Sequence, residues 1–178
     1  MHKVFKEIGF KRLFRYTIFS LWQWVFELLP FHPLRIFWMR LGGAKIGKAC
    51  IIDKIDFINL DRTGLKGLKI GRECFIGRGA MLDLAGSLVL GNQVTVSSRA
   101  MLLTHFSVGF SNHPLIKKYP KCVKKTTLEN GCFVSVGSII FPGVKLGEQS
   151  IIAAGSIVRS SVPANSLAAG VPAEIKKK

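Results

Sequence analysis

An aliphatic residue recurs every six positions along most of this chain. The series runs Ile46, Ile52, Ile58, Ile70, Ile76, Leu82, Leu88, then Leu90, Val96, Leu102, and after a break Leu128, Val134, Ile140, Leu146, Ile152, Val158. Helical patterns repeat near 3.6 residues and strand patterns at two, so a period of six fits neither an ordinary helix nor a hairpin sheet. It is typical of a parallel β-helix, in which three short strands form each triangular coil.

The positions between the aliphatic residues favour small side chains. Cys50, Cys74 and Cys132 all occupy the slot four residues after an aliphatic position. We expect about five to six coils between residue 46 and roughly residue 163, stacked at the ~4.8 Å spacing of strands. We interpret the slip between Leu88 and Leu90, and Gly64 at an expected aliphatic position, as tolerated imperfections of the repeat.

Residues 1–41 form a separate, apolar and helical N-terminal segment that contains all three tryptophans. From Tyr16 to Leu29 the polar residues follow one narrow stripe, which predicts a helix with a broad apolar face. Pro30 and Pro33 are expected to end it, and it is too short to cross a bilayer. With basic residues before it, the helix fits the membrane interface. The alternative is that it packs on the β-helix or on another subunit.

The charge and the cysteines limit the classes of function. The net charge is +16, and the excess of basic over acidic residues is concentrated in residues 1–45 and 106–127 rather than along the repeat. Because no nucleic-acid-binding motif accompanies this charge, a nucleic-acid partner is not expected. The four cysteines lack the paired spacing of a zinc site, so no metal is expected. We interpret them as reduced, space-filling residues, which indicates the cytoplasm.

The period is lost after Leu102 and returns at Leu128, so residues 106–127 form a long excursion loop. A loop of this length in a regular coil is typical of a functional site. His105 lies at its start, and a histidine can transfer protons near neutral pH. Three of the five lysines of the loop, Lys117, Lys118 and Lys121, either meet a phosphate of a substrate or of the cofactor, or lie in solvent.

The C-terminal third resembles a known family. The stretches 140–147 (IFPGVKLG), 153–158 (AAGSIV), 162–165 (VPAN) and 169–173 (AGVPA) are similar to the signature of hexapeptide-repeat acyltransferases. Within that family the chain is most similar to galactoside and maltose O-acetyltransferases and to acetyltransferases of capsule and colanic-acid clusters. Residues 40–47 (RLGGAKIG) also resemble the polysaccharide-cluster members.

The resemblance implies a left-handed parallel β-helix acyltransferase domain over residues 42–175, followed by a basic tail at 176–178. It also implies a homotrimer with acetyl-CoA bound between adjacent subunits. In the family, a histidine that follows a threonine is the general base, which here is His105 after Thr104. The resemblance also implies that Thr104 contacts the substrate. The position that donates a backbone N–H to the oxyanion falls on Val136.

Other correspondences with the family are partial. Phe133 stands where relatives have a tryptophan lining the site, and Asp83 stands where serine acetyltransferases contact the acceptor. Asp83 therefore orients an acceptor hydroxyl or forms a corner turn. The cofactor-binding positions that the resemblance implies are Ala154, Arg159, Ser160, Lys176 and Lys177.

These inferences together predict an acetyl-CoA-dependent O-acetyltransferase that modifies a carbohydrate hydroxyl, in surface polysaccharide or lipid-linked glycan biosynthesis. An acceptor in or near a membrane would explain the N-terminal segment, with the protein on the cytoplasmic face. Two alternatives remain: an N-acetyltransferase of an amino-sugar nucleotide, and a non-catalytic trimeric scaffold. A metal-dependent, carbonic-anhydrase-like β-helix would need three converging histidines, and only His105 and His113 lie in the repeat region.

Overall fold

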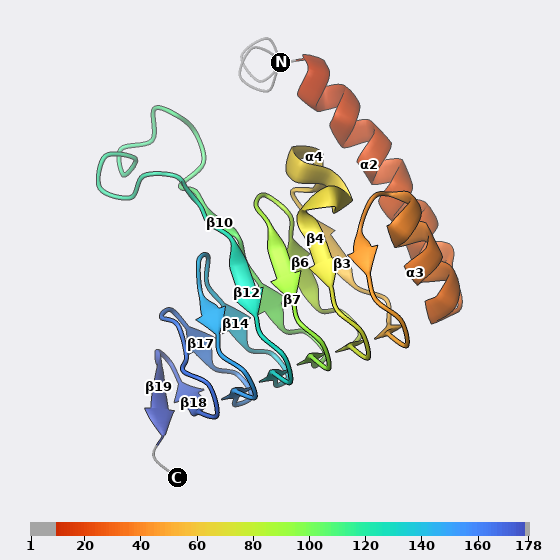
Figure 1. The fold of residues 1–178 in the computed structure, drawn as a ribbon. Helices are drawn as coiled ribbons and strands as arrows, with labels where there is room; N and C mark the ends of the chain where they lie inside the picture. The colour runs from red at the N-terminus through yellow and green to blue at the C-terminus, as the bar shows by residue number, and fades with distance from the viewer. Residues whose placement is uncertain (1–9, 177–178) are drawn as a thin grey trace.

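The computed structural model describes residues 10–176, so residues 1–9 and the predicted tail residues Lys177 and Lys178 lie outside the described part of the chain. Successive coils stack along one axis, so that their strands form three parallel sheets, and two helices lie at the N-terminal end (Figure 1). The first sheet contains β1 (Lys45–Ile46), β4 (Leu68–Ile70), β7 (Leu88–Leu90), β12 (Thr126–Leu128) and β15 (Lys145–Leu146). The second contains β2 (Ile51–Ile52), β5 (Phe75–Ile76), β8 (Thr95–Val96), β13 (Phe133–Val134), β16 (Ile151–Ile152) and β18 (Leu167–Gly170), with β19 (Ala173–Lys176) antiparallel at its edge. The third contains β3 (Asp56–Ile58), β6 (Met81–Asp83), β9 (Met101–Leu102), β14 (Ile139–Ile140) and β17 (Ile157–Val158).

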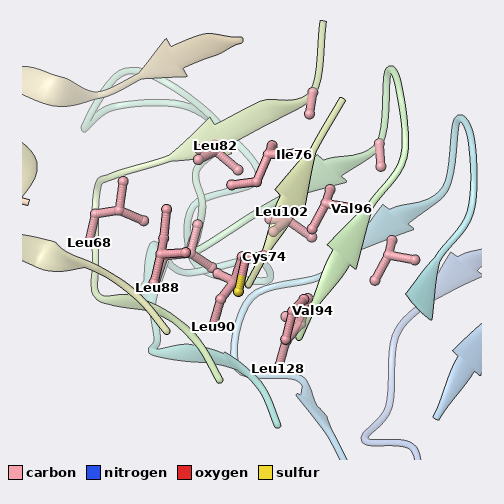
Figure 2. Close-up of a cluster of buried hydrophobic side chains, with 14 of the residues drawn as sticks. Leu68, Cys74, Ile76, Leu82, Leu88, Leu90, Val94, Val96, Leu102 and Leu128 are labelled. Carbon is pink, nitrogen blue, oxygen red and sulfur yellow. The ribbon is translucent and has the colours of Figure 1, made fainter. Parts of the chain in front are cut away.

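The six-residue repeat places one aliphatic side chain of each strand inside the prism. In the first sheet the paired residues are Ile46, Ile70, Leu90, Leu128 and Leu146, all buried. Leu82, Ile76, Val96 and Leu102 converge on the same core from the other two sheets (Figure 2). Each such leucine contributes about 1.5–3 kcal/mol through burial. The three parallel sheets confirm the predicted solenoid and are consistent with a left-handed β-helix.

The first coil departs from the predicted repeat at one position. Ile58 was expected to fill the core, but Phe57 pairs with Leu82 and packs against the core instead. Phe57 makes edge-on contacts with Trp22 and Phe26 of the N-terminal segment. The inward position shifts by one because this end of the prism is filled by aromatic rings rather than by another coil.

The cysteines of the small-residue slot are unpaired, as predicted. The thiols of Cys50, Cys74 and Cys132 each donate to a glycine carbonyl of the next coil, at 3.1 Å. Burial raises the pKa of the Cys74 thiol to about 11. These thiols are therefore packing residues rather than nucleophiles.

The N-terminal segment forms two helices, α2 (Phe10–Leu28) and α3 (His32–Leu41). Pro33 lies in the first turn of α3, where its missing N–H has no cost, so it begins a second helix rather than only ending the first. In α3, Ile36 and Met39 belong to the core of the prism and cover its open end. None of the described helices is long and apolar enough to span a membrane.

Helix α2 uses two faces differently. On the inner face Phe26 is fully buried, and the Trp22 ring stacks between Phe26 and Trp38. The opposite face leaves large apolar side chains exposed, and these are Phe14, Ile18, Leu21, Trp24 and Leu28. The inner face of α2 therefore packs on the β-helix, as the alternative prediction had it. The outer face is not covered by any part of the described chain.

All three irregularities of the repeat lie on one edge of the prism, where the third sheet turns into the first. The Gly64 position belongs to an insertion, α4 (Leu60–Thr63) and the 3₁₀ turn η1 (Gly64–Gly67). The slip at Leu88 is the widened turn after Asp83, and the break after Leu102 is the excursion loop. Our interpretation of the first two as imperfections was wrong, because both add chain at the edge from which the excursion loop leaves (Figure 1).

Candidate active site

A histidine and a carboxylate from adjacent coils meet at this edge. His105 opens β10 (His105–Phe106), which pairs antiparallel with β11 (Cys122–Val123) and forms the neck of the excursion loop. Its Nδ1 lies 2.8 Å from Oδ2 of Asp83, at the end of β6. Because an ionised carboxylate only accepts hydrogen bonds, Nδ1 carries the proton and Nε2 keeps its lone pair. The ring is thus held in the tautomer that a general base requires.

The Asp83 carboxylate accepts further hydrogen bonds that fix its position beside His105. Oδ2 also accepts from the backbone N–H groups of Thr104 and His105, while Oδ1 accepts from the Ala85 N–H and the Asn59 side chain, all at 2.8–3.0 Å. Burial raises the pKa of the Asp83 carboxyl, but the hydrogen bonds from His105, Thr104, Ala85 and Asn59 outweigh it, so the pKa is lowered overall. Asp83 therefore stays ionised in the folded protein.

The Asp83 side chain is 0% exposed and does not line the cavity. The sequence predicted that it orients an acceptor hydroxyl or forms a corner turn. The structure gives it the corner turn and adds a contact that the sequence did not predict, the hydrogen bond to His105. Asp83 is a positioning residue for the imidazole.

Thr104 fixes the corner from which His105 projects. Its hydroxyl donates to the Asp83 carbonyl and accepts from the Gly86 N–H, both at 2.9 Å. Gly86 lies against the neck of the loop, where an added Cβ would come within 3.0 Å of the Val123 side chain. Thr104 is fully buried and does not line the cavity, so it supports the site instead of making the substrate contact that the sequence predicted.

His105 opens into a cavity of about 830 Å³. Ligand sites of proteins commonly have volumes of about 300–1,000 Å³. The walls come from α2, α4 and the excursion loop, and the lining residues are Leu13, Tyr16, Asn59, Asp61, Arg62, His105, Ser107, Gly109, Phe110, Ser111 and Lys121. The N-terminal helix is thus a wall of the candidate site.

Of the predicted site residues within 10–176, only His105 lines this cavity. Val136 and Ala154 lie in turns between the second and third sheets, at a different edge of the prism, and Phe133 lies exposed on the second sheet. Arg159 and Ser160 follow β17, on the same edge as His105 but two strands along the third sheet, roughly 10 Å away. Lys176 lies in β19, next to the end of the described chain.

Asn59, Arg62 and Tyr16 line the cavity but were not predicted from the sequence as site residues. The gap at Gly64 was the available signal for the first two, because a skipped aliphatic position in a solenoid marks inserted chain. Tyr16 could not be placed, since only the packing of α2 brings it to the cavity. Among the described residues, no group of histidine, cysteine, aspartate and glutamate side chains could hold a metal ion.

The chain is similar in sequence to several acetyltransferases, although no protein-family model matches it. It is 27% identical to a galactoside O-acetyltransferase of Lactococcus lactis over 139 residues, which cover 76% of this chain and 63% of the relative. It is 28% identical to a candidate colanic acid biosynthesis acetyltransferase of Escherichia coli, over 79% of this chain and 72% of the relative. Serine acetyltransferase of Escherichia coli is 32% identical over 100 residues, only 34% of its length. The chain therefore spans less than two thirds of the first of these relatives and about a third of the last.

Solved structures share the fold. A hexapeptide-repeat acetyltransferase of Vibrio cholerae superposes with a TM-score of 0.80 at 18% identity, covering 95% of this chain and 93% of that one. A galactoside acetyltransferase in complex with coenzyme A gives a TM-score of 0.76 at 23% identity, covering 94% and 80%. The coverage shows that the similarity extends beyond the coils into the N-terminal segment.

Proposed function

We propose that this chain, which belongs to the hexapeptide-repeat acetyltransferase family, transfers an acetyl group from acetyl-CoA to a carbohydrate hydroxyl. The observation that carries the proposal is the 2.8 Å contact between His105 Nδ1 and a buried carboxylate at a cavity large enough for a sugar. The O-acetyltransferases among the relatives support the choice of a sugar hydroxyl as the acceptor.

In the proposed reaction His105 Nε2 removes the acceptor hydroxyl proton as the oxygen attacks the thioester carbonyl. A new C–O bond forms, the tetrahedral oxyanion collapses, the C–S bond breaks, and the imidazolium returns its proton to the departing thiolate. A hydroxyl is too weak an acid to ionise at neutral pH, so a positioned base contributes about 10²–10⁴-fold. The Asp83 carboxylate stabilises the imidazolium while it exists.

The oxyanion requires a fixed donor. The resemblance assigns this role to the backbone N–H of Val136, which donates no hydrogen bond to another described residue. Val136 is 51% exposed, so a substrate can reach its amide.

We further propose that the complete site lies between two copies in a homotrimer of left-handed β-helices. In one copy His105 and the turns with Val136 and Ala154 lie on different edges, so a neighbouring copy must supply these turns. Phe133, Arg159, Ser160, Lys176 and Lys177 are the remaining proposed contacts to acetyl-CoA and acceptor. The coenzyme A complex of the galactoside acetyltransferase supports a CoA site in this fold.

The proposal is tested by a screen with radiolabelled acetyl-CoA across neutral sugars, sugar phosphates, nucleotide sugars and lipid-linked glycans. We expect base-labile label on a sugar hydroxyl. Label on the amine of an amino-sugar nucleotide, retained in His105→Ala, would indicate an N-acetyltransferase instead, because an amine needs less help from a base. Failure of every acceptor to accelerate release of the CoA thiol would support a non-catalytic scaffold.

We also propose that the outer face of α2 and α3 contacts a membrane surface, as a peripheral attachment near the acceptor. Large apolar side chains of this face, among them Leu21, Trp24 and Phe37, are 61–64% exposed. The chain's net charge of +16 favours an anionic lipid surface. Because α2 also walls the cavity, an acceptor at that surface would lie close to His105.

Replacing Leu21, Trp24 and Leu28 together with glutamine is expected to reduce recovery on anionic liposomes at least about tenfold, since each side chain loses apolar burial in lipid. Deleting residues 1–41 is not a usable test, because Phe26, Ile36 and Met39 belong to the core. A variant with glutamine at Val171 and Ile175, which are exposed at the other end of the prism, is the matched control. Equal flotation of both variants and the wild type would refute the membrane contact.

A further inference from the structure

Two cationic side chains line the cavity beside His105. Arg62 comes from the inserted helix α4, and Lys121 comes from the excursion loop. Lys117 and Lys118, which the sequence did not distinguish from Lys121, do not line the cavity. Of the three lysines, the fold therefore places Lys121 in the cavity wall. Arg62, about 60 positions earlier in the chain, lines the same cavity.

The Arg62 side chain is half-buried and has no acidic partner among the described residues. Its Nε is buried and has no hydrogen-bond partner, and no ion pair between Arg62 or Lys121 and an acidic residue is found in the described part of the chain. The Arg62 backbone carbonyl accepts a 2.9 Å hydrogen bond from Arg15, which ties α4 to α2 and fixes where Arg62 begins. Because Arg62 lines the cavity without an acidic partner among the described residues, its positive charge favours an anionic ligand there.

Apart from Arg62, Lys121 and His105, the cavity wall contains one charged side chain among residues 10–176. Asp61 is the acidic residue of the lining, and it is buried and engaged in an interaction of its own. Tyr16, Leu13 and Phe110 supply apolar and aromatic surface of the kind that packs against a sugar ring. The site thus combines a surface for a ring, a base for a hydroxyl, and two cations.

We propose that the acceptor is an anionic carbohydrate, whose phosphate or carboxylate is held by Arg62 and Lys121 while His105 faces the hydroxyl. An arginine fork binds phosphate or carboxylate oxygens in a bidentate manner, and a nearby lysine adds a second charge. This inference rests on the proposed acetyl transfer, but it concerns binding of the acceptor and can be measured without catalysis.

The test compares calorimetric binding of galactose 1-phosphate, glucuronate and galactose to the full chain. We expect both anionic sugars to bind at least about tenfold more tightly than galactose, and we expect Arg62→Gln to remove this preference. Lys121→Gln should weaken it, and Arg62→Lys should restore part of it, because the charge returns without the fork. Preference for only one of the two anions would identify phosphate or carboxylate as the recognised group.

Lys118→Gln, in the same loop but outside the cavity, is the matched control and should bind like the wild type. Thermal unfolding of each variant separates loss of binding from loss of fold. Equal affinity for galactose and both anions, or a preference that persists in the Arg62→Gln, Lys121→Gln double variant, would overturn the proposal. Acetylation of neutral sugars alone would overturn it while leaving the proposed acetyl transfer intact, whereas selective binding without any acetyl transfer would do the reverse.

Discussion

Replacing His105 with alanine is expected to reduce acetyl transfer to a sugar hydroxyl by about 10²–10⁴-fold while the coils remain folded. The loss arises because the acceptor then attacks without a group that removes its proton. The backbone of residue 105 keeps its pairing with Val123, and Asp83 keeps its hydrogen bonds from Thr104, Ala85 and Asn59. Initial rates of CoA thiol release, with and without acceptor, measure the effect.

His113→Ala is the matched control for this prediction. His113 lies in the same excursion loop, its Nδ1 accepts a hydrogen bond from the Leu115 N–H, and it does not line the cavity. We expect its rate to stay close to that of the wild type. Similar rates for wild type and His105→Ala, with the same acceptor, would remove the general base from the account.

Replacing Asp83 with asparagine is expected to have the second largest effect, again about 10²–10⁴-fold on kcat. The amide oxygen of asparagine can still accept from Ala85 and Asn59. Its NH₂ group must then face the N–H groups of Thr104 and His105, and it must donate to His105 Nδ1. That donation moves the ring proton to Nε2 and removes the lone pair that would take the acceptor proton.

The same substitution tests stability. Donors that face an amide NH₂ lose their acceptor, at a cost of about 1–3 kcal/mol each, so urea unfolding should shift to lower concentration. Because folding lowers the pKa of Asp83, its contribution is complete above the ordinary carboxyl pKa, near 4, and is lost as the pH falls through the lowered value. Wild type should therefore lose part of its advantage over Asp83→Asn below about pH 4.

Asp53→Asn serves as the control for both effects. The Asp53 carboxylate is 39% exposed, and its nearest cation, Arg35, is 3.9 Å away. Such a contact contributes little. A normal rate for Asp83→Asn, together with an unchanged urea midpoint, would show that the Asp83–His105 contact does not order the imidazole.

The regular part of this chain could be predicted because one residue in six has to enter the prism. That rule located the buried ladders of Ile70, Leu90 and Leu128 from the sequence alone. It failed at Ile58, where tertiary contacts with Trp22 and Phe26 replaced the neighbouring coil. The six-residue repeat does not indicate which residues pack against the end of the solenoid.

The candidate site is built from the places where the period fails. The insertion at Gly64, the widened turn after Asp83 and the excursion loop after Leu102 supply Arg62, the carboxylate and His105 on successive coils of one edge. The break after Leu102 was recognised because it is long. The insertion at Gly64 and the widened turn after Asp83 were not recognised as parts of a site. They matter because they lie on the same edge as His105, and only the strand register shows which edge each one occupies.

The cavity wall from α2 was beyond prediction for a different reason. The sequence indicated a helix with an apolar face, but the burial of Phe26 determines which way the helix turns and hence that Tyr16 meets His105 across the cavity. That residues 16 and 105 line the same cavity leaves no local pattern in either segment.

A crystal structure of the protein with coenzyme A and an acceptor sugar would show whether His105 faces the reacting groups. We predict that CoA lies between two copies, with its sulfur and the acceptor hydroxyl about 3–3.5 Å from a common reacting position next to Nε2 of His105. We also predict that the Val136 N–H of the neighbouring copy points to that position. CoA bound with every His105 ring beyond hydrogen-bonding reach of its sulfur and of the acceptor would contradict the account.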